Sequence, residues 1–260
     1  MNIFSSKPVK ALPGKEICCV YDSFGPVRVY DDGNKRYLTF GAEDEQSCIV
    51  KASPTVLQHD YNRAMLLVLL FNQPQNATFL GLGGGTLPSC FSHHLPDIQL
   101  TVVELRQVVI DTAYKYFALP ETDNLNLIAG DALTYIDDPA HSADGQCDLL
   151  FSDLFLAEGL EVKQFTRQFI KNALRVLSDE GWLVMNCLDE YRTEQVLSGL
   201  LGEHFTSVWE CVTDDGNWVI IAGKSAEKTD SKTRFRVAKQ WSERLGFSLI
   251  PHLKRLVKYC

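Results

Sequence analysis

A glycine-rich stretch at residues 79–89, FLGLGGGTLPS, constrains this chain more than any other segment. An apolar run over 77–82 enters a loop that carries four glycines, and a predicted helix follows. The pattern predicts a buried strand that turns into a helix, where backbone N–H groups can come close to a nucleotide. Because glycine-rich loops also serve as plain turns, the loop alone leaves a purely structural role open.

Strand-like and helical segments alternate after this loop, which predicts a parallel sheet with helices on both faces. A last pair of strands, joined at Asp214-Asp215-Gly216, adds an antiparallel hairpin. The predicted fold is therefore an α/β, Rossmann-like, doubly wound sheet of seven strands, with the terminal hairpin typical of S-adenosylmethionine methyltransferases. The parallel strands are expected at 77–82, 98–104, 124–129, 147–152 and 181–188, and the helices between them at 86–95, 106–117, 163–177 and 190–202.

Three units are predicted along the chain. Residues 1–54 comprise a loose arm and a small antiparallel β domain, in which Asp32-Gly33 marks a hairpin turn. Residues 55–225 form the main domain, which opens with a helix over 55–72 that ends before Pro74. Residues 226–260 are expected to form a basic amphipathic helical tail that packs on the domain or on a partner subunit.

Composition limits the classes of partner. A net charge of −8 argues against general nucleic-acid binding, and the longest uninterrupted apolar run, 65–71, is too short to span a membrane. We therefore expect no nucleic-acid or membrane partner and a cytoplasmic location. The eight cysteines form no CxxC pair and no zinc-like cluster with histidine, so we expect reduced, mostly structural thiols and no metal site.

Three acids at the ends of predicted strands indicate a nucleotide site. Glu104 closes the second strand about 20 residues after the glycine loop, where an acid commonly accepts hydrogen bonds from ribose hydroxyls. Asp131 follows the third strand and Asp153 ends the fourth. Each alone could be a helix cap or a turn acid, but together they face the crevice where open α/β sheets bind ligands. Thr86 falls where GxGxxG requires its third glycine, which disfavours a nicotinamide cofactor.

These segments resemble the spermidine synthase family and its bacterial relatives. The resemblance runs from about Tyr21 to Lys224 and is carried by FLGLGGGT, TVVELRQVVIDTAYKYFALP, NLNLIAGDAL and CDLLFSDLF at their observed spacing. It implies an adenosyl-sulfonium ligand, and dimers are common in the family. It implies that Gln46 and Tyr61 lie near the substrate and that Asp153 helps to deprotonate an attacking amine. It also implies that the nucleotide is bound by Gly81, Gly83, Gly85, Glu104, Asp131 and Ala132.

The chain departs from the family at positions that bind amines. The family reads GGGDG in the loop, DxxDP after the fourth strand and YHE before the first strand. Here Thr86 and Leu156 replace two acids, and Asn62-Arg63 follows Tyr61. Desolvating the two charges of putrescine without paired carboxylates costs several kcal/mol per charge, so putrescine is a poor acceptor. Thr86 no longer repels the carboxylate of intact S-adenosylmethionine, and Arg63 would attract an anionic group if it faces the site.

We therefore expect a transferase that binds S-adenosylmethionine or its decarboxylated form as co-substrate. Asp153 is the expected base, with Tyr61 beside it, and methyl transfer to a small-molecule acceptor is favoured. Aminopropyl transfer to an amine other than putrescine is the alternative, and a non-catalytic nucleotide-binding protein is a second one. A homodimer is compatible with the β domain and the tail.

Overall fold

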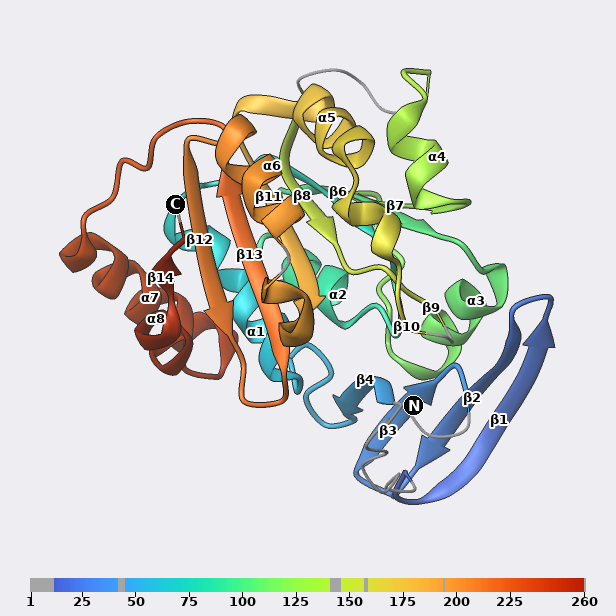
Figure 1. The fold of residues 1–260 in the computed structure, drawn as a ribbon. Coiled ribbons are helices and arrows are strands. Elements are labelled where there is room, and N and C mark those ends of the chain that lie inside the picture. The colour runs from blue at the N-terminus through green and yellow to red at the C-terminus, as the bar shows by residue number, and fades with distance from the viewer. Residues whose placement is uncertain (1–11, 42–44, 141–145, 157–158, 194, 260) are drawn as a thin grey trace, which may run out of the picture.

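The computed structural model describes residues 12–41, 45–140, 146–156, 159–193 and 195–259. Most of the predicted N-terminal arm, residues 1–11, lies outside this part of the chain. Figure 1 shows a small N-terminal sheet set to one side of a large twisted sheet, with helices on both faces of the large sheet. None of the helices described in these ranges is both long and apolar enough to cross a membrane.

The N-terminal sheet is antiparallel, in the order β1-β2-β3-β4. Its strands are β1 (Lys15–Asp22), β2 (Gly25–Asp31), β3 (Lys35–Thr39) and β4 (Glu45–Val50). The hairpin predicted at Asp32-Gly33 joins β2 to β3 and is confirmed. Val27 and Val29 of β2 and Leu38 of β3 form a core cluster with Val109 of helix α3 (Gln107–Tyr116), and this cluster joins the small sheet to the main body.

The large sheet has the strand order β14-β12-β13-β11-β8-β5-β6-β7. Strands β7, β6, β5, β8 and β11 are parallel and follow one another in this order across the sheet, whereas β12, β13 and β14 are antiparallel to their neighbours. The predicted fold class and terminal hairpin are confirmed, with β14 as an additional eighth strand. The strands are β5 (Asn76–Leu80), β6 (Gln99–Glu104), β7 (Leu125–Ala129), β8 (Cys147–Ser152), β11 (Leu177–Leu188), β12 (Ser207–Val212), β13 (Asn217–Gly223) and β14 (Val257–Lys258).

Helices cover both faces of the sheet, so its central strands are apolar on both sides. Successive residues of β8 show this: Phe151 joins the core on one face and Leu150 the core on the other. One face carries α1 (Asp60–Met65), the 3₁₀ segment η1 (Leu66–Leu70), α2 (Thr86–His94) and the tail helices. The opposite face carries α4 (Ala132–Asp137), α5 (Arg167–Val176) and α6 (Gln195–His204).

Several elements differ from the predicted boundaries. The helix expected over 55–72 is divided into α1 and η1, because the chain tightens into a 3₁₀ turn at Leu66. The segment after β8 forms a short hairpin, β9 (Phe155–Leu156) and β10 (Gly159–Leu160), that was not predicted. Two further 3₁₀ segments are η2 (Val162–Phe165) and η3 (Asp189–Thr193).

The C-terminal tail packs on the main domain. Helix α7 (Ser231–Leu245) begins at Asp230, whose carboxylate accepts a hydrogen bond from the Thr233 N–H, and ends at Gly246. Helix α8 (Ile250–Arg255) is tied to α1, because Asp60 accepts from His252 at 2.6 Å and from Arg255 at 2.8 Å. These contacts hold the start of α1, which carries Tyr61, against the tail.

Candidate active site

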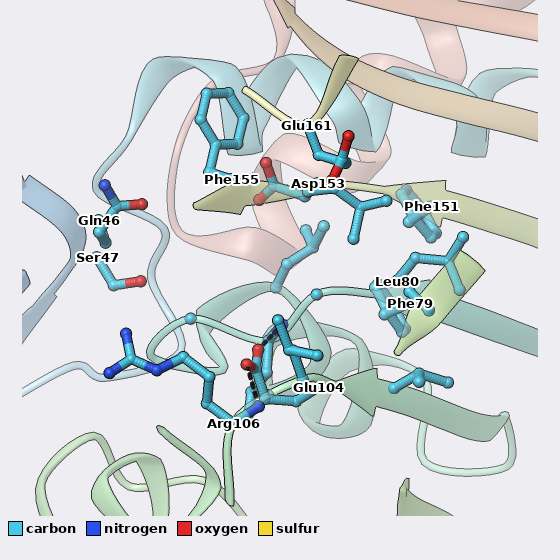
Figure 2. Close-up of a pocket in the computed structure, with 18 of the residues that line it drawn as sticks. Gln46, Ser47, Phe79, Leu80, Glu104, Arg106, Phe151, Asp153, Phe155 and Glu161 are labelled. Atoms are coloured by element: carbon cyan, nitrogen blue, oxygen red, sulfur yellow. Dashed lines mark hydrogen bonds between the residues drawn. The ribbon is translucent and has the colours of Figure 1, made fainter. Parts of the chain in front are cut away.

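A cavity of about 280 Å³ lies at the carboxyl ends of β5, β6, β7 and β8. This is the edge where ligands bind in open α/β sheets. Figure 2 shows the residues after these strands on one side of the cavity and Gln46 and Ser47 of β4 on the other. The N-terminal sheet therefore supplies part of the wall.

The glycine loop connects β5 to α2 through backbone conformations that favour glycine. Gly81, Gly83 and Gly85 have φ of 96°, 55° and 69°. A Cβ at Gly81 would overlap the carbonyl oxygen of Asp153, so glycine is required there for the two strand ends to meet. The Gly84 N–H donates to Ser47 Oγ at 2.8 Å, which fixes the loop against β4.

Glu104 is held under the glycine loop. Its carboxylate accepts from the Leu82 N–H at 3.0 Å and from the Arg106 N–H at 3.0 Å (Figure 2). Burial raises the pKa of Glu104, while these backbone N–H groups and that of Gly83 oppose the rise. A carboxylate has about four lone-pair positions, so oxygen sites are left for the hydroxyls of a ligand.

Asp131 and Ala132 line the same cavity from the end of β7. Asp131 is also the N-cap of α4, because its Oδ1 accepts from the Leu133 N–H at 2.9 Å. The sequence left open that this acid is a helix cap, and the structure shows that it is one. The same residue also lies at the cavity. A ligand role for Asp131 stays a prediction.

Asp153 follows β8 and is half-buried in the cavity wall. Its Oδ1 accepts from Asn186 Nδ2 at 2.8 Å, and the Asn186 amide oxygen in turn accepts from Asn217 at 3.0 Å. Burial raises the pKa of Asp153, and the hydrogen bonds from Asn186 and Tyr61 oppose the rise. Burial and the charge of Asp153 raise the pKa of Tyr61 well above its usual range. Tyr61 therefore keeps its proton and acts as a donor to the carboxylate.

Thr86 and Asn62 form a neutral pair on the cavity wall. Asn62 Nδ2 donates to Thr86 Oγ1 at 3.4 Å, and both side chains are buried. The amide oxygen of Asn62 is buried without a hydrogen-bond partner. Because a buried polar atom without a partner costs free energy, this oxygen favours a ligand that brings a donor group.

Two expected site residues do not line this cavity. Gly85 is the N-cap of α2, where it bounds the loop rather than the cavity. Arg63 donates from Nε to the Leu57 carbonyl at 2.8 Å, and its guanidinium lies 4.8 Å from the Phe247 ring centre. Residues two apart on a helix do not share a face, so Tyr61 directed at the cavity places Arg63 away from it. The expectation that Arg63 contacts an anionic substrate is not retained.

The structure adds cavity residues that the sequence reasoning missed. Asn186 had a signal, since it is a polar residue inside the apolar strand segment WLVMNCL. Arg106 also had one, two residues after Glu104 at a strand end. Ser23, Phe24, Phe40 and Ser47 come from the N-terminal sheet, whose docking on the loop no local pattern reveals.

The charge of the cavity is predominantly negative. Four carboxylates line it, and the single guanidinium among the lining residues, that of Arg106, is paired with Asp22 outside the lining. Such a wall favours cationic ligands, including a sulfonium and an amine. In the described part of the chain, no three His, Cys, Asp or Glu side chains gather as a metal site. The four carboxylates are Glu104, Asp131, Asp153 and Glu161.

This sheet order and this cavity define an S-adenosylmethionine-type transferase. A polyamine aminopropyltransferase of Neisseria meningitidis serogroup A is 30% identical over 210 residues, which cover 79% of this chain and 78% of that protein. The chain belongs to the polyamine aminopropyltransferase family, as the resemblance to spermidine synthases implied. No family model matches the sequence.

Two solved structures support the fold. A probable spermidine synthase from Corynebacterium glutamicum superimposes with a TM-score of 0.73 at 17% identity, over 90% of this chain and 88% of that one. Human methyltransferase-like protein 13 in complex with SAH superimposes with a TM-score of 0.64 at 18% identity, over 73% of this chain and 93% of that one. The same architecture is thus found among aminopropyltransferases and methyltransferases.

Proposed function

We propose that this protein transfers a methyl group from intact S-adenosylmethionine to a small-molecule acceptor, with an amine as the acceptor that suits the site best. The observation that carries this proposal is the neutral Thr86–Asn62 pair in the cavity wall. At the position of Thr86 the family has an aspartate, which favours a donor without a carboxylate. The Thr86 hydroxyl and the Asn62 amide can both donate and accept hydrogen bonds. This wall is therefore compatible with the amino group and with the carboxylate of the intact donor.

Asp153 is the proposed base. In the transfer, the acceptor lone pair forms a bond to the methyl carbon, and the C–S bond breaks so that its electron pair stays on the sulfur of the leaving thioether. An amine acceptor must first be unprotonated, and Asp153 takes the proton that it gives up. The raised pKa of Asp153 makes it a stronger base than an exposed aspartate, while Tyr61 and Asn186 fix its orientation.

Aminopropyl transfer from decarboxylated S-adenosylmethionine is the second candidate. It is supported by the negative cavity wall and by the name of the Neisseria relative. In this reaction the acceptor attacks the aminopropyl carbon and the leaving group is methylthioadenosine. The two candidates therefore differ in donor and in nucleoside product.

The test supplies each donor separately to the purified protein with a panel of mono-, di- and polyamines and small acids. Mass spectrometry then measures S-adenosylhomocysteine, methylthioadenosine and the modified acceptor. We expect S-adenosylhomocysteine to form from the intact donor, and the Asp153→Asn variant to bind the donor but form little product. Methylthioadenosine and an aminopropylated amine from the decarboxylated donor alone would contradict methyl transfer and establish the second candidate. Donor binding without any product would indicate a nucleotide-binding protein without catalysis.

A further inference from the structure

A second cavity, of about 610 Å³, lies at the junction of α1 and α8. Asp60 and Arg63 of α1 line it together with His252, Lys254 and Arg255 of α8. Figure 1 shows α8 at the edge of the large sheet, beside β12. This cavity is therefore built by the C-terminal tail and the helix on which the tail packs.

Helix α1 separates this cavity from the active site. Tyr61 lines the active-site cavity, whereas its sequence neighbours Asp60 and Arg63 line the second cavity. Among the described residues, the two cavities share no lining residue. A ligand in the second cavity therefore does not occupy the place of the donor or of the acceptor.

The second cavity is cationic, in contrast to the active-site cavity. Its lining carries three positive charges, on Arg63, Lys254 and Arg255, and two carboxylates, Asp60 and Asp214. The lining thus has a net positive charge in a chain whose net charge is −8. A concave wall of one predominant charge attracts ligands of the opposite charge, which here are anions.

Arg63 brings a half-buried guanidinium to this lining. Its Nε donates to the Leu57 carbonyl at 2.8 Å, and its guanidinium lies 4.8 Å from the ring centre of Phe247. It forms no ion pair in the part of the chain that the structure describes, and burial lowers its pKa. A partly desolvated cation without a paired anion costs free energy, and a guanidinium matches an oxyanion with two parallel donors. A bound oxyanion would therefore offset this cost.

Arg255 is held between two carboxylates of different exposure. Its Nη2 donates to Asp60 Oδ2 at 2.8 Å, and its Nη1 forms an ion pair with Asp214 Oδ2 at 2.9 Å. The Asp214 side chain is 94% exposed, so this second pair contributes little free energy. An oxyanion in the cavity can replace Asp214 at Nη1.

His252 adds a buried ring nitrogen. The residue is 2% exposed, and its Nε2 bonds to Asp60 Oδ1 at 2.6 Å. A carboxylate only accepts, so we assign the proton to Nε2, and Nδ1 is left without a hydrogen-bond partner. Burial lowers the pKa of His252, and Asp60 opposes this effect. A neighbouring anion favours the protonated ring, whose Nδ1 becomes a donor.

We propose that the cavity between α1 and α8 binds an oxyanion of the phosphate type, with Arg63 and Arg255 as its main ligands, and that His252 takes up a proton on binding. The volume exceeds that of one phosphate ion and falls in the range of small-molecule sites, so we expect the phosphate group of a small molecule. This site goes beyond the proposed transfer reaction and does not depend on it.

The test measures binding of sulfate, phosphate and glycerol phosphate by calorimetry, with chloride used to keep the ionic strength constant. The proteins are full-length wild type, Arg63→Gln and Arg236→Gln. Arg236 is exposed on α7 and lines neither cavity, so its variant removes the same charge outside the site. We expect Arg63→Gln to weaken sulfate binding about 10-fold or more, because hydrogen bonds between charged groups are lost, and Arg236→Gln to bind like wild type.

Asp214→Asn should tighten sulfate binding by about two- to fivefold, the range of an exposed ion pair, because it removes the carboxylate that competes for Arg255. Loss of the fold would not produce a gain in affinity, so this variant separates the site from instability. We also expect glycerol phosphate to bind more tightly than phosphate. The reverse order would overturn the assignment to a phosphorylated molecule and identify the free ion.

Sulfate also tests His252, because sulfate keeps its charge between about pH 5 and 8, where histidine titrates. The groups that face His252 are Asp60 and Arg63 of α1, Arg255 of α8 and Cys211 of β12. Burial opposes it, but His252 and Arg255 lower the pKa of Asp60, and burial raises the pKa of Cys211 to about 11. These neighbours therefore keep their charge state in this range. We expect sulfate affinity to increase as the pH falls in wild type, and to change less in His252→Gln, which keeps a donor for Asp60.

Three results would contradict this inference. No saturable binding of any of the anions to wild type, or equal affinity of folded Arg63→Gln and Arg236→Gln, would overturn the site, and thermal unfolding shows which variants are folded. A wild-type affinity for sulfate that is independent of pH would overturn the role of His252. Displacement of bound S-adenosylhomocysteine by sulfate would place the anion in the active site instead. Because anion binding is measured without a donor, failure of the transfer reaction would leave the anion results unchanged.

Discussion

Replacing Thr86 by aspartate tests what selects the donor. The side chain lines the cavity and is buried, so a carboxylate at this position would act on a bound donor with little screening by solvent. Position 86 is the first residue of α2, where an acid interacts favourably with the helix dipole by about 0.3–1 kcal/mol. We therefore expect Thr86→Asp to fold and to retain the geometry of the loop.

The size of the effect follows from the charges. Two unit charges 4 Å apart interact by about 4 kcal/mol at the effective dielectric constant near a protein surface. The intact donor brings an ammonium and a carboxylate, whose interactions with an aspartate largely cancel, whereas the decarboxylated donor brings the ammonium alone. The surrounding structure can relax, and burying a second carboxylate in the cavity that already contains Asp153 costs free energy. Both effects reduce the preference for the decarboxylated donor. We expect the preference to shift toward the decarboxylated donor by about 10- to 100-fold, or about 1.4–2.8 kcal/mol.

The assay is competition binding of the two donors to wild type, Thr86→Asp and Thr86→Asn. The asparagine variant matches aspartate in shape and lacks its charge, so it controls for crowding. We expect Thr86→Asn to change both affinities by a similar factor, and Thr86→Asp alone to change their ratio. A ratio that is equal in the two variants would refute the reasoning that charge at position 86 selects the donor.

Three further substitutions probe the site. Asp153→Asn should decrease transfer at least about 100-fold, as expected for loss of a general base, while donor affinity measured by calorimetry stays within about threefold. Glu104→Gln should weaken adenosyl-ligand binding about 10-fold or more in the same assay, because a hydrogen bond to a charged group is lost. Gly81→Ala should lower the free energy of unfolding, measured with denaturant, by about 1–3 kcal/mol, because its φ is positive and the added Cβ meets the Asp153 carbonyl. Gly216→Ala also has a positive φ but open space around it, so it controls for backbone strain, and we expect it to lower the free energy of unfolding less than Gly81→Ala does.

The burial of Asp153 also determines two pH effects. Its folded pKa is raised, so the folded state binds this proton more tightly than the unfolded state, and the resulting stability is present at low pH and lost as the pH rises through the folded pKa. Removing the charge in Asp153→Asn should therefore raise the unfolding temperature at neutral pH relative to wild type. Transfer should increase with pH as Asp153 loses its proton. A variant less stable than wild type at neutral pH would contradict this account.

The strand-end part of the site was predictable because it depends on local patterns. Parallel strands end at one edge of a sheet, so Glu104, Asp131 and Asp153 had to lie near the glycine loop once their strands were identified. The role of Arg63 was predicted only for the case that it faces the site, because the sequence does not show which face of the helix packs on the domain. On α1 the two side chains point to different faces, and the aromatic ring of Phe247 holds Arg63 on the far side.

Contacts between the sheets explain why the remaining residues were missed. The Gly84 N–H to Ser47 bond and the Arg106–Asp22 pair both join the N-terminal sheet to the loops of the large sheet, over separations of 37 and 84 residues. The residue pattern of either segment predicts that it forms a strand with one buried face. The pattern does not predict which distant segment that strand contacts. The division predicted at residue 54 stays a prediction, but the cavity lies on both sides of it. The glycine loop therefore supplies one wall of the cavity, and another part of the wall depends on a sheet that folds from a separate part of the chain.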